Sequence, residues 1–600
     1  MTVSSPSPLN KKKARFLLFL CFFVFSSLAD EFTFFDAIVD GDVPQVKAIL
    51  ADGVVDVNYP DENGDLALVV AARGGDTDMV SALLEGGADI AAYSTYPADA
   101  NTALTAAASA GQRDVAELLM GNGASVDQRG HDGRTALMSA AARGETEMVQ
   151  FFLDRGADVE AAKGDGTTSL FWAAHEGHAA TVALLAGAGA DVRKREFVEG
   201  AEPIHFAVQQ KLPSQSNSSS GSARNTRLVL QHLLTFGAAP GARTGIVGPR
   251  NGDGTFKKDP EREEMQGGRT PLMLAAHTGN LPAMEVLLGL LGSTDSNGSG
   301  GKSSKRGKEK IDEGVVDIDA VDVQGMTALA LAATEGRHRA VEMLLKRGTA
   351  EVAAVAASAP SGDEPRALSL DIPNFEAKSP LHHAAFGGHL ETVKRLVRAG
   401  ARVDLPSALT NGAGAGHTSL LLASYQGRYK VVKYLLKQGK ADPNMAAKDG
   451  ATPLIAAASA GQKQIVKALL KAGADPRRRL EGGETAAVVT SDRAIARMLH
   501  LKEYEYYAEE QRAKQATNHR PGEEEESDDT DPGRRRDVDD SESVGAEEKL
   551  ANVLGELEND GGLGIGSDDE DDEDDEDDED MDDEETDEYE DESPGMRNEL

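Results

Sequence analysis

The stretch Thr135–Ala162, TALMSAAARGETEMVQFFLDRGADVEAA, contains the features that decide the fold. Thr135 can accept backbone hydrogen bonds as the N-cap of a first helix, in which consecutive alanines allow close helix packing. Gly144 interrupts the chain, and a second helix follows with apolar residues spaced for one helical face. The residues of that face are Met148, Val149, Phe152 and Leu153. Gly156 is placed to end the second helix, so the stretch predicts a helix–turn–helix unit.

The same pattern recurs along most of the chain. Copies beginning at Asn101, Arg134 and Thr167 follow one another at a spacing of 33 residues. Further copies begin at Arg269, Met326, Lys378, His417, Ala451 and Glu484, and weaker copies begin at Asp65 and Ala201. A single unit cannot bury both of its apolar edges, so we expect the units to stack and the terminal units to act as caps.

The period and the motif of these copies, as in Arg269–Ala276 (RTPLMLAA), resemble ankyrin repeats. The resemblance implies an all-α ankyrin-repeat solenoid, in which helix–turn–helix units are joined by β-hairpin loops. It predicts about 12 units over residues 30–514, at the family's period. We expect Ser-, Gly- and Lys-rich insertions, forming mobile loops, near residues 210–224, 243–268, 292–314 and 353–375.

The negative charge of the chain is concentrated in a C-terminal tail, residues 515–600. The whole chain has a net charge of -39, and 39 acidic residues against five basic ones lie in residues 521–600. The run Asp568–Glu592 holds 22 acidic residues in 25 positions, which predicts a disordered, self-repelling segment. Such a run can bind calcium weakly or attract basic proteins, or simply be solvated, whereas it repels nucleic acids.

Both ends of the chain indicate the secretory pathway. Residues 1–29 combine a basic segment with the apolar run Phe16–Ala29 and small residues before Asp30, as in a signal peptide. An uncleaved anchor, or a nuclear signal in the basic segment, is the alternative interpretation. The last four residues, Arg597, Asn598, Glu599 and Leu600, resemble the Lys-Asp-Glu-Leu retrieval signal of the endoplasmic reticulum, with Asn in place of Asp. Asn217 and Asn297 begin N-x-S sequences that are candidate glycosylation sites.

The sequence contains no motif of an enzyme, a cofactor site or a specific metal site. Its one cysteine, Cys21, lies in the expected signal peptide, so the remaining chain has no thiol. His175 and His178 lack the spacing that places two zinc ligands on one helical face. His205 and His382 match the histidine of the ankyrin T-P-L-H motif, whose side chain forms hydrogen bonds within the hairpin.

The resemblance implies that a protein partner binds hairpin tips and first-helix positions on the concave face. The candidate contact residues are Arg134, Arg143, His175, Glu176, Arg269, His277, Glu335, Phe386, His417, Tyr425 and Gln426. We therefore predict a non-enzymatic scaffold or adaptor of the endoplasmic reticulum lumen with a weakly calcium-binding tail. The alternative is a nuclear or cytosolic adaptor whose acidic tail binds histones or other basic proteins.

Overall fold

The computed structural model describes residues 33–53, 55–94, 101–209, 219–245, 267–289, 316–358, 369–407 and 416–518. Within these ranges the chain is helical, and its β-type contacts are two isolated bridges, Tyr93–Thr102 and Arg479–Thr485. The predicted all-α fold is therefore confirmed. The chain divides into two units, Met1–Glu503 and Tyr504–Leu600. The helix pairs described below lie in the first unit, except that the last helix, α24, continues into the second.

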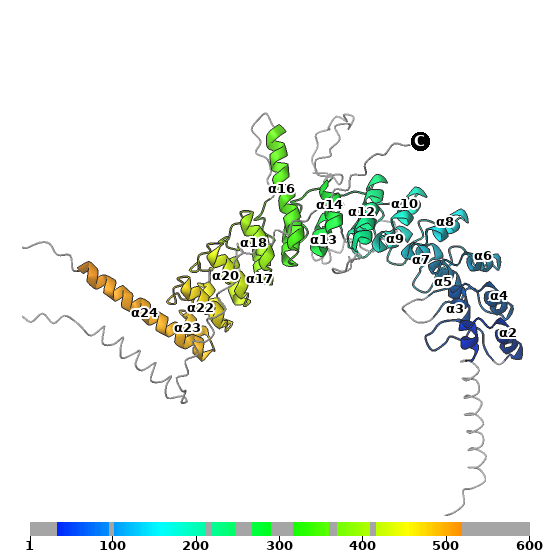
Figure 1. Ribbon diagram of the computed structural model, residues 1–600, viewed down its shortest axis with the longest axis horizontal. Helices are drawn as coiled ribbons and strands as arrows, with labels where there is room; N and C mark the ends of the chain where they lie inside the picture. The colour runs from blue at the N-terminus through cyan, green and yellow to red at the C-terminus, as the bar shows by residue number, and fades with distance from the viewer. Residues whose placement is uncertain are drawn as a thin grey trace, which may run out of the picture. The chain divides into compact units, whose positions relative to one another are not determined.

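Twelve helix pairs follow one another in the described part of the chain, beginning with the helix of residues 33–39 and α2 (Figure 1). The first helices of the later pairs are α3 Ala67–Gly74, α5 Ala103–Ser109, α7 Ala136–Arg143, α9 Ser169–Glu176, α11 Pro203–Val208, α13 Pro271–Thr278, α15 Ala328–Thr334, α17 Pro380–Gly387, α19 Ser419–Tyr425, α21 Pro453–Ser459 and α23 Ala486–Val489. The second helices are α2 Val43–Asp52, α4 Thr77–Glu85, α6 Arg113–Gly121, α8 Thr146–Asp154, α10 Ala179–Gly187, α12 Ser219–Thr235, α14 Leu281–Gly289, α16 His338–Ser358, α18 Leu390–Arg398, α20 Tyr429–Lys437, α22 Lys463–Lys471 and α24 Arg493–Asn518.

The ends of the helices follow from the residues predicted to cap them. The Thr135 side chain accepts a hydrogen bond from the Met138 N–H at 3.4 Å and so begins α7. Thr270, Thr327 and Thr418 begin their helices in the same way. Gly144 ends α7 with a φ of 76°, in the left-handed region that a residue with a side chain seldom adopts.

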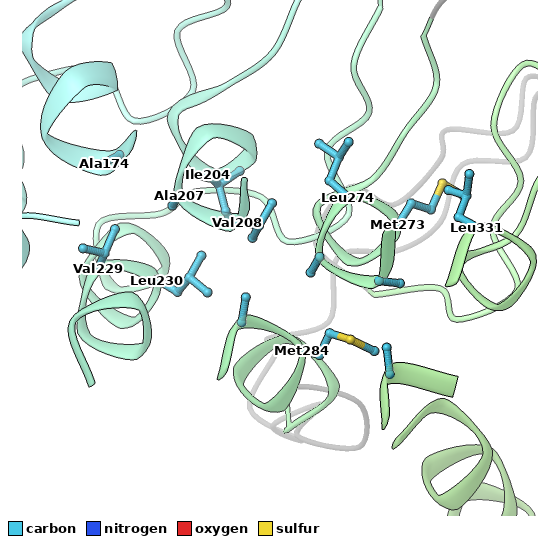
Figure 2. Close-up of a cluster of buried hydrophobic side chains, with 14 of the residues drawn as sticks. Ala174, Ile204, Ala207, Val208, Val229, Leu230, Met273, Leu274, Met284 and Leu331 are labelled. Atoms are coloured by element: carbon cyan, nitrogen blue, oxygen red, sulfur yellow. The ribbon is translucent and has the colours of Figure 1, made fainter. Parts of the chain in front are cut away.

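Small side chains allow the first helices to pack directly on one another. In α7 the side chains of Ala136, Ala140 and Ala141 are completely buried, and α7 contacts both α5 and α9. The second helices supply larger side chains to the same core. Figure 2 shows this division between α11 and α15, where Ile204 and Val208 of a first helix meet Val229 and Leu230 of the following second helix. The core therefore runs continuously from one pair to the next.

The predicted apolar face of α8 leaves out one buried residue. Leu153 is half-buried and packs against the core, and Phe151, which the helical period places outside the face, is only 2% exposed. Two guanidinium groups cover its ring, because Arg155 lies 3.7 Å and Arg113 of the preceding pair lies 5.2 Å from the ring centroid. Phe151 thus belongs to the core and is also covered by charged side chains, through cation–π contacts that the hydrophobic period does not report.

The loops that join the pairs are hairpin-like turns. In the loop before α7 the Gly130 N–H donates to the Arg134 carbonyl at 2.9 Å, and the Gly133 N–H donates to the Gly130 carbonyl at 3.0 Å. Some loop tips are also bonded to each other, as when the Phe197 N–H donates to the Asp165 carbonyl of the preceding loop at 2.7 Å. These bonds hold successive loops side by side.

Two of the predicted insertions overlap with helices. Helix α12 begins at Ser219, inside the predicted 210–224 insertion, because the following residues continue into its buried apolar face. Helix α16 continues to Ser358, inside the predicted 353–375 insertion, through an alanine-rich segment with high helix propensity. The other predicted insertions, the signal peptide, Asn217, Asn297, the run Asp568–Glu592 and the residues Arg597 to Leu600 lie wholly or largely outside the described residues.

Candidate protein-binding surface

The predicted contact residues occupy two positions that repeat from pair to pair. One position is the C-terminal end of the first helix, where the structure places Arg143, His175, Glu176, His277, Glu335, Phe386, Tyr425 and Gln426. The other position immediately precedes the N-cap threonine of the first helix and is occupied by Arg134, Arg269 and His417. Because adjacent first helices contact each other, both positions form rows along the stack.

Two aromatic side chains in the first of these rows are exposed. Phe386 is 47% and Tyr425 is 55% exposed, at equivalent positions of the neighbouring helices α17 and α19. Burying an exposed aromatic ring is a large favourable contribution at a protein interface. These two residues are therefore suited to contact a partner, as the sequence predicts.

Two histidines of these rows, His277 and His417, have a pKa below the ordinary value. Partial burial lowers the pKa of His277, and the positive charges of Arg269 and Arg337 lower it further, against the opposing effect of Glu335. Burial also lowers the pKa of His417, where Lys378 adds to the effect and Asp449 opposes it. At neutral pH His277 and His417 consequently present uncharged imidazoles.

Arg269 contributes to the scaffold as well as to the surface. Its Nε lies 3.4 Å from a carboxylate oxygen of Asp322, whose side chain is 1% exposed. Removing the guanidinium would leave this buried carboxylate without its ion pair, which destabilises a fold strongly. Arg269 is therefore a poor choice for testing partner binding by mutation.

A cluster of aromatic and basic side chains lies around Trp172 of α9, in the part of the stack formed by α7 and α9. The ring of Trp172 is contacted by two cations, with the Arg134 guanidinium carbon 4.5 Å and the Lys163 Nζ 5.1 Å from the ring centroid. Asp132 lies within 3.5 Å of Arg134 and 3.4 Å of Lys163, and so holds both cations over the indole. The result is a pre-organised group of the residue types that dominate binding energies.

This group continues into the next repeat through Phe206. The Phe206 ring packs edge-to-face on Phe171, with centroids 5.1 Å apart, and lies 6.2 Å from the ring of His175. His175 in turn contacts the Glu176 carboxylate at 2.9 Å. We refer to Arg134, Lys163, Trp172, His175 and Phe206 as the Trp172 cluster.

The sequence predicts Arg134 and His175 as contact residues, but not Trp172, Lys163 or Phe206. Trp172 and Phe206 occupy the fourth position of their first helices, where α7 has the small Ser139. This position faces the loops, since Trp172 is contacted by Lys163 of the loop before α9 and by Arg134 of the loop before α7. The signal available in the sequence was the single tryptophan of the chain, at a position that is small in some other repeats, as in Ala106, Ser139 and Ala456.

The remaining histidines that suggested a metal site have structural roles. Nε2 of His178 bonds the Ala142 carbonyl at 3.1 Å, and Nε2 of His389 bonds the Thr334 carbonyl at 2.9 Å, so each ties one pair to the preceding pair. In the described ranges no three His, Cys, Asp or Glu side chains are grouped to bind a metal ion. Among the described helices none is both long and apolar enough for a membrane span.

A stack of helix pairs with rows of exposed side chains along one side defines a helical-repeat protein. The family described as "Ankyrin repeats (3 copies)" matches residues 34–130, 121–196, 225–356, 303–407, 354–447, 381–480 and 420–499. The chain therefore belongs to the ankyrin-repeat family. It is 38% identical over 81 residues to "Ankyrin repeat and SAM domain-containing protein 6" of Mus musculus, a match that covers 14% of this chain and 8% of that protein. Ankyrin repeats serve as protein–protein interaction scaffolds, and this role applies to the chain.

Proposed function

We propose that the chain is a non-enzymatic adaptor of the endoplasmic reticulum lumen whose protein partner binds at the Trp172 cluster. The observation that carries the proposal is the stacking of Arg134 and Lys163 on Trp172 beside Phe206. Tryptophan and arginine are enriched among residues that dominate interface energies, and here their side chains are held in place before binding.

Replacing Trp172 tests this proposal. Partners are first identified by cross-linking the full chain in its native cell, and their affinities for purified variants are then measured. We expect Trp172→Ala to weaken binding about 30-fold or more, as loss of a hot-spot residue does. The matched control is Phe236→Ala, which removes an aromatic ring that is 44% exposed just beyond α12 and outside both rows. Equal binding by both variants would remove the basis for the cluster as a contact site.

The lumenal location is supported by the signal-like residues 1–29, by the terminal Arg-Asn-Glu-Leu and by the two N-x-S sequences. We expect protein isolated from its native cell to carry a glycan at Asn217 or Asn297, and glycosidase treatment should then lower its mass. A fluorescent tag placed before Arg597 should show a reticular distribution. An unchanged mass together with nuclear or cytosolic fluorescence would favour the alternative adaptor that binds basic proteins.

The acidic tail is proposed to bind many calcium ions weakly. Neighbouring carboxylates in the run Asp568–Glu592 repel each other, and a divalent cation relieves that repulsion. Isothermal titration of the full chain should give several sites with dissociation constants of roughly 0.1–1 mM, weakened by added salt. Deleting residues 567–592 should abolish this binding and leave the melting of the repeats unchanged. A tight site that survives the deletion would contradict the proposal.

A further inference from the structure

The second helices carry opposite charges toward the two ends of the stack. Helices α4, α6 and α8 together contain six acidic residues and one arginine. Helices α18, α20 and α22 contain nine lysines and arginines and one glutamate. These helices are equivalent elements of the repeat, so the difference is not a consequence of the fold (Figure 1). We call the outer side of α18, α20 and α22, which carries these positive charges, the basic face.

The positive charges of the basic face stand in two rows. Lys394, Lys433 and Lys467 occupy the fifth position of their helices, while Arg398, Lys437 and Lys471 occupy the ninth. Helix α20 packs against both α18 and α22, and packed helices lie about 10 Å apart. Each row therefore presents one cation about every 10 Å.

Part of these rows has no ion pair with the carboxylates that the structure describes. Glu391 pairs with Lys394 at 2.9 Å, and Glu342 pairs with Arg395 from the preceding pair of helices. Lys437, Lys467 and Lys471 are exposed, and none of the carboxylates that the structure describes lies within ion-pair distance of them. Cations at such close spacing repel one another, and a bound polyanion would relieve that repulsion.

We propose that the basic face binds the acidic run of this chain, residues 568–592. With 22 acidic residues in 25 positions, the run supplies a carboxylate opposite every lysine in almost any register. An extended peptide advances about 3.3 Å per residue, so every third residue of the run matches the spacing of the rows. The contact needs charge density rather than a particular sequence, and this is what the run provides.

A long connection tethers the acidic run to the helix pairs. Roughly 50 residues separate Asn518, the end of α24, from Asp568, and a coil of that length spans about 40 Å on average. The basic face belongs to the three helix pairs that precede the last pair of the stack, so the same chain carries both elements near its C-terminal end. Tethering gives the run an effective concentration in the millimolar range, so it binds ahead of free polyanions.

Anisotropy of a fluorescein-labelled peptide of residues 568–592 tests the proposal, at low salt and with a chelator so that calcium plays no part. The proteins are the full chain and the chain lacking residues 568–592, whose melting is compared by circular dichroism. We expect the deleted chain to bind the peptide at least tenfold more tightly than the full chain, in which the tethered run occupies the face. Equal binding by the two proteins, or no binding by either, overturns the proposal.

Two triple variants of the deleted chain locate the contact. Lys437→Gln with Lys467→Gln and Lys471→Gln should weaken peptide binding roughly tenfold, since each exposed ion pair contributes modestly. Arg113→Gln with Arg143→Gln and Arg224→Gln removes the same charge from exposed positions elsewhere, and should change binding less than about twofold. Equal weakening by both triples shows diffuse attraction and overturns the assignment. Tighter binding of anionic vesicles or of polyuridylate than of the peptide would also overturn it.

Discussion

Phe152→Ala should lower the free energy of unfolding by about 3–5 kcal/mol, because it removes a large side chain that has no exposed surface. Phe152 lies in α8, and the helices around it form a continuous core whose neighbours cannot close the cavity without moving apart. In a stack of repeats the loss is local, so urea denaturation followed by circular dichroism should show an early transition separate from the main one.

Phe386→Ala is the matched control for this prediction. It makes the same change of side chain in a first helix where the ring is 47% exposed, and should cost less than about 1 kcal/mol. Similar destabilisation by the two variants would mean that burial in the stack does not set the stability, and that the assigned core is incorrect.

Acidification should destabilise the repeats through two buried histidines. Burial lowers the pKa of His205 and of His382 to about 4, against an opposing effect of hydrogen bonds to backbone carbonyls. Nδ1 of His382 accepts the Ser379 N–H at 3.1 Å and its Nε2 bonds the His417 carbonyl at 3.0 Å, so the neutral ring already satisfies both neighbours. A proton added to Nδ1 of His382 would point at the Ser379 N–H, which is itself a donor, so this hydrogen bond would be lost.

The pKa of both histidines is therefore lower in the folded chain than the ordinary value of 6.5. Above pH 6.5 the two histidines are mostly neutral in both the folded and the unfolded chain, so they do not lower the free energy of unfolding. Between pH 6.5 and 4 the unfolded chain binds protons that the folded chain does not, so stability falls as the pH falls. Each group should remove about 3 kcal/mol by pH 4, from about 1.4 kcal/mol for each unit of pKa difference.

Denaturant titrations at a series of pH values measure this loss. His382→Met and His205→Met are suitable variants because the chain itself uses methionine there, and Met273 Sδ accepts the Thr270 N–H in the equivalent bond at 3.4 Å. The double variant should lose roughly two thirds of the pH dependence between pH 6.5 and 4.5, because burial also lowers the pKa of His383 to about 4 and that residue is unchanged. A pH dependence as steep as that of the unchanged chain would exclude the two histidines as its source.

The repeats were predictable from the sequence because each signal in them is local. Thr135 and Gly144 cap α7 through bonds to residues within a few positions, so the sequence around them contains the whole cause. The burial of Phe151 was not predictable in this way, since Arg113 comes from another helix pair.

The Trp172 cluster could be predicted only in part, for the same reason. Arg134 and His175 follow from their positions in the repeat, but the stacking on Trp172 depends on Lys163 and Asp132 arriving from two different loops. The sequence places Trp172 inside a first helix, but it does not show the two loops whose cations reach the indole ring. The opposite charges of the second helices are visible in the sequence, yet their meaning depends on knowing which side of each helix is exposed.

The way the helix pairs are joined has a mechanical consequence. The main contacts of each pair are with the pair before it and the pair after it. Pulling on the two ends would therefore detach helix pairs one at a time, starting at a terminal pair, and not break the whole stack at once. A force–extension trace should show a series of small, regularly spaced peaks. Under tension the protein would lengthen in steps and recoil when released, as a spring made of separate links does.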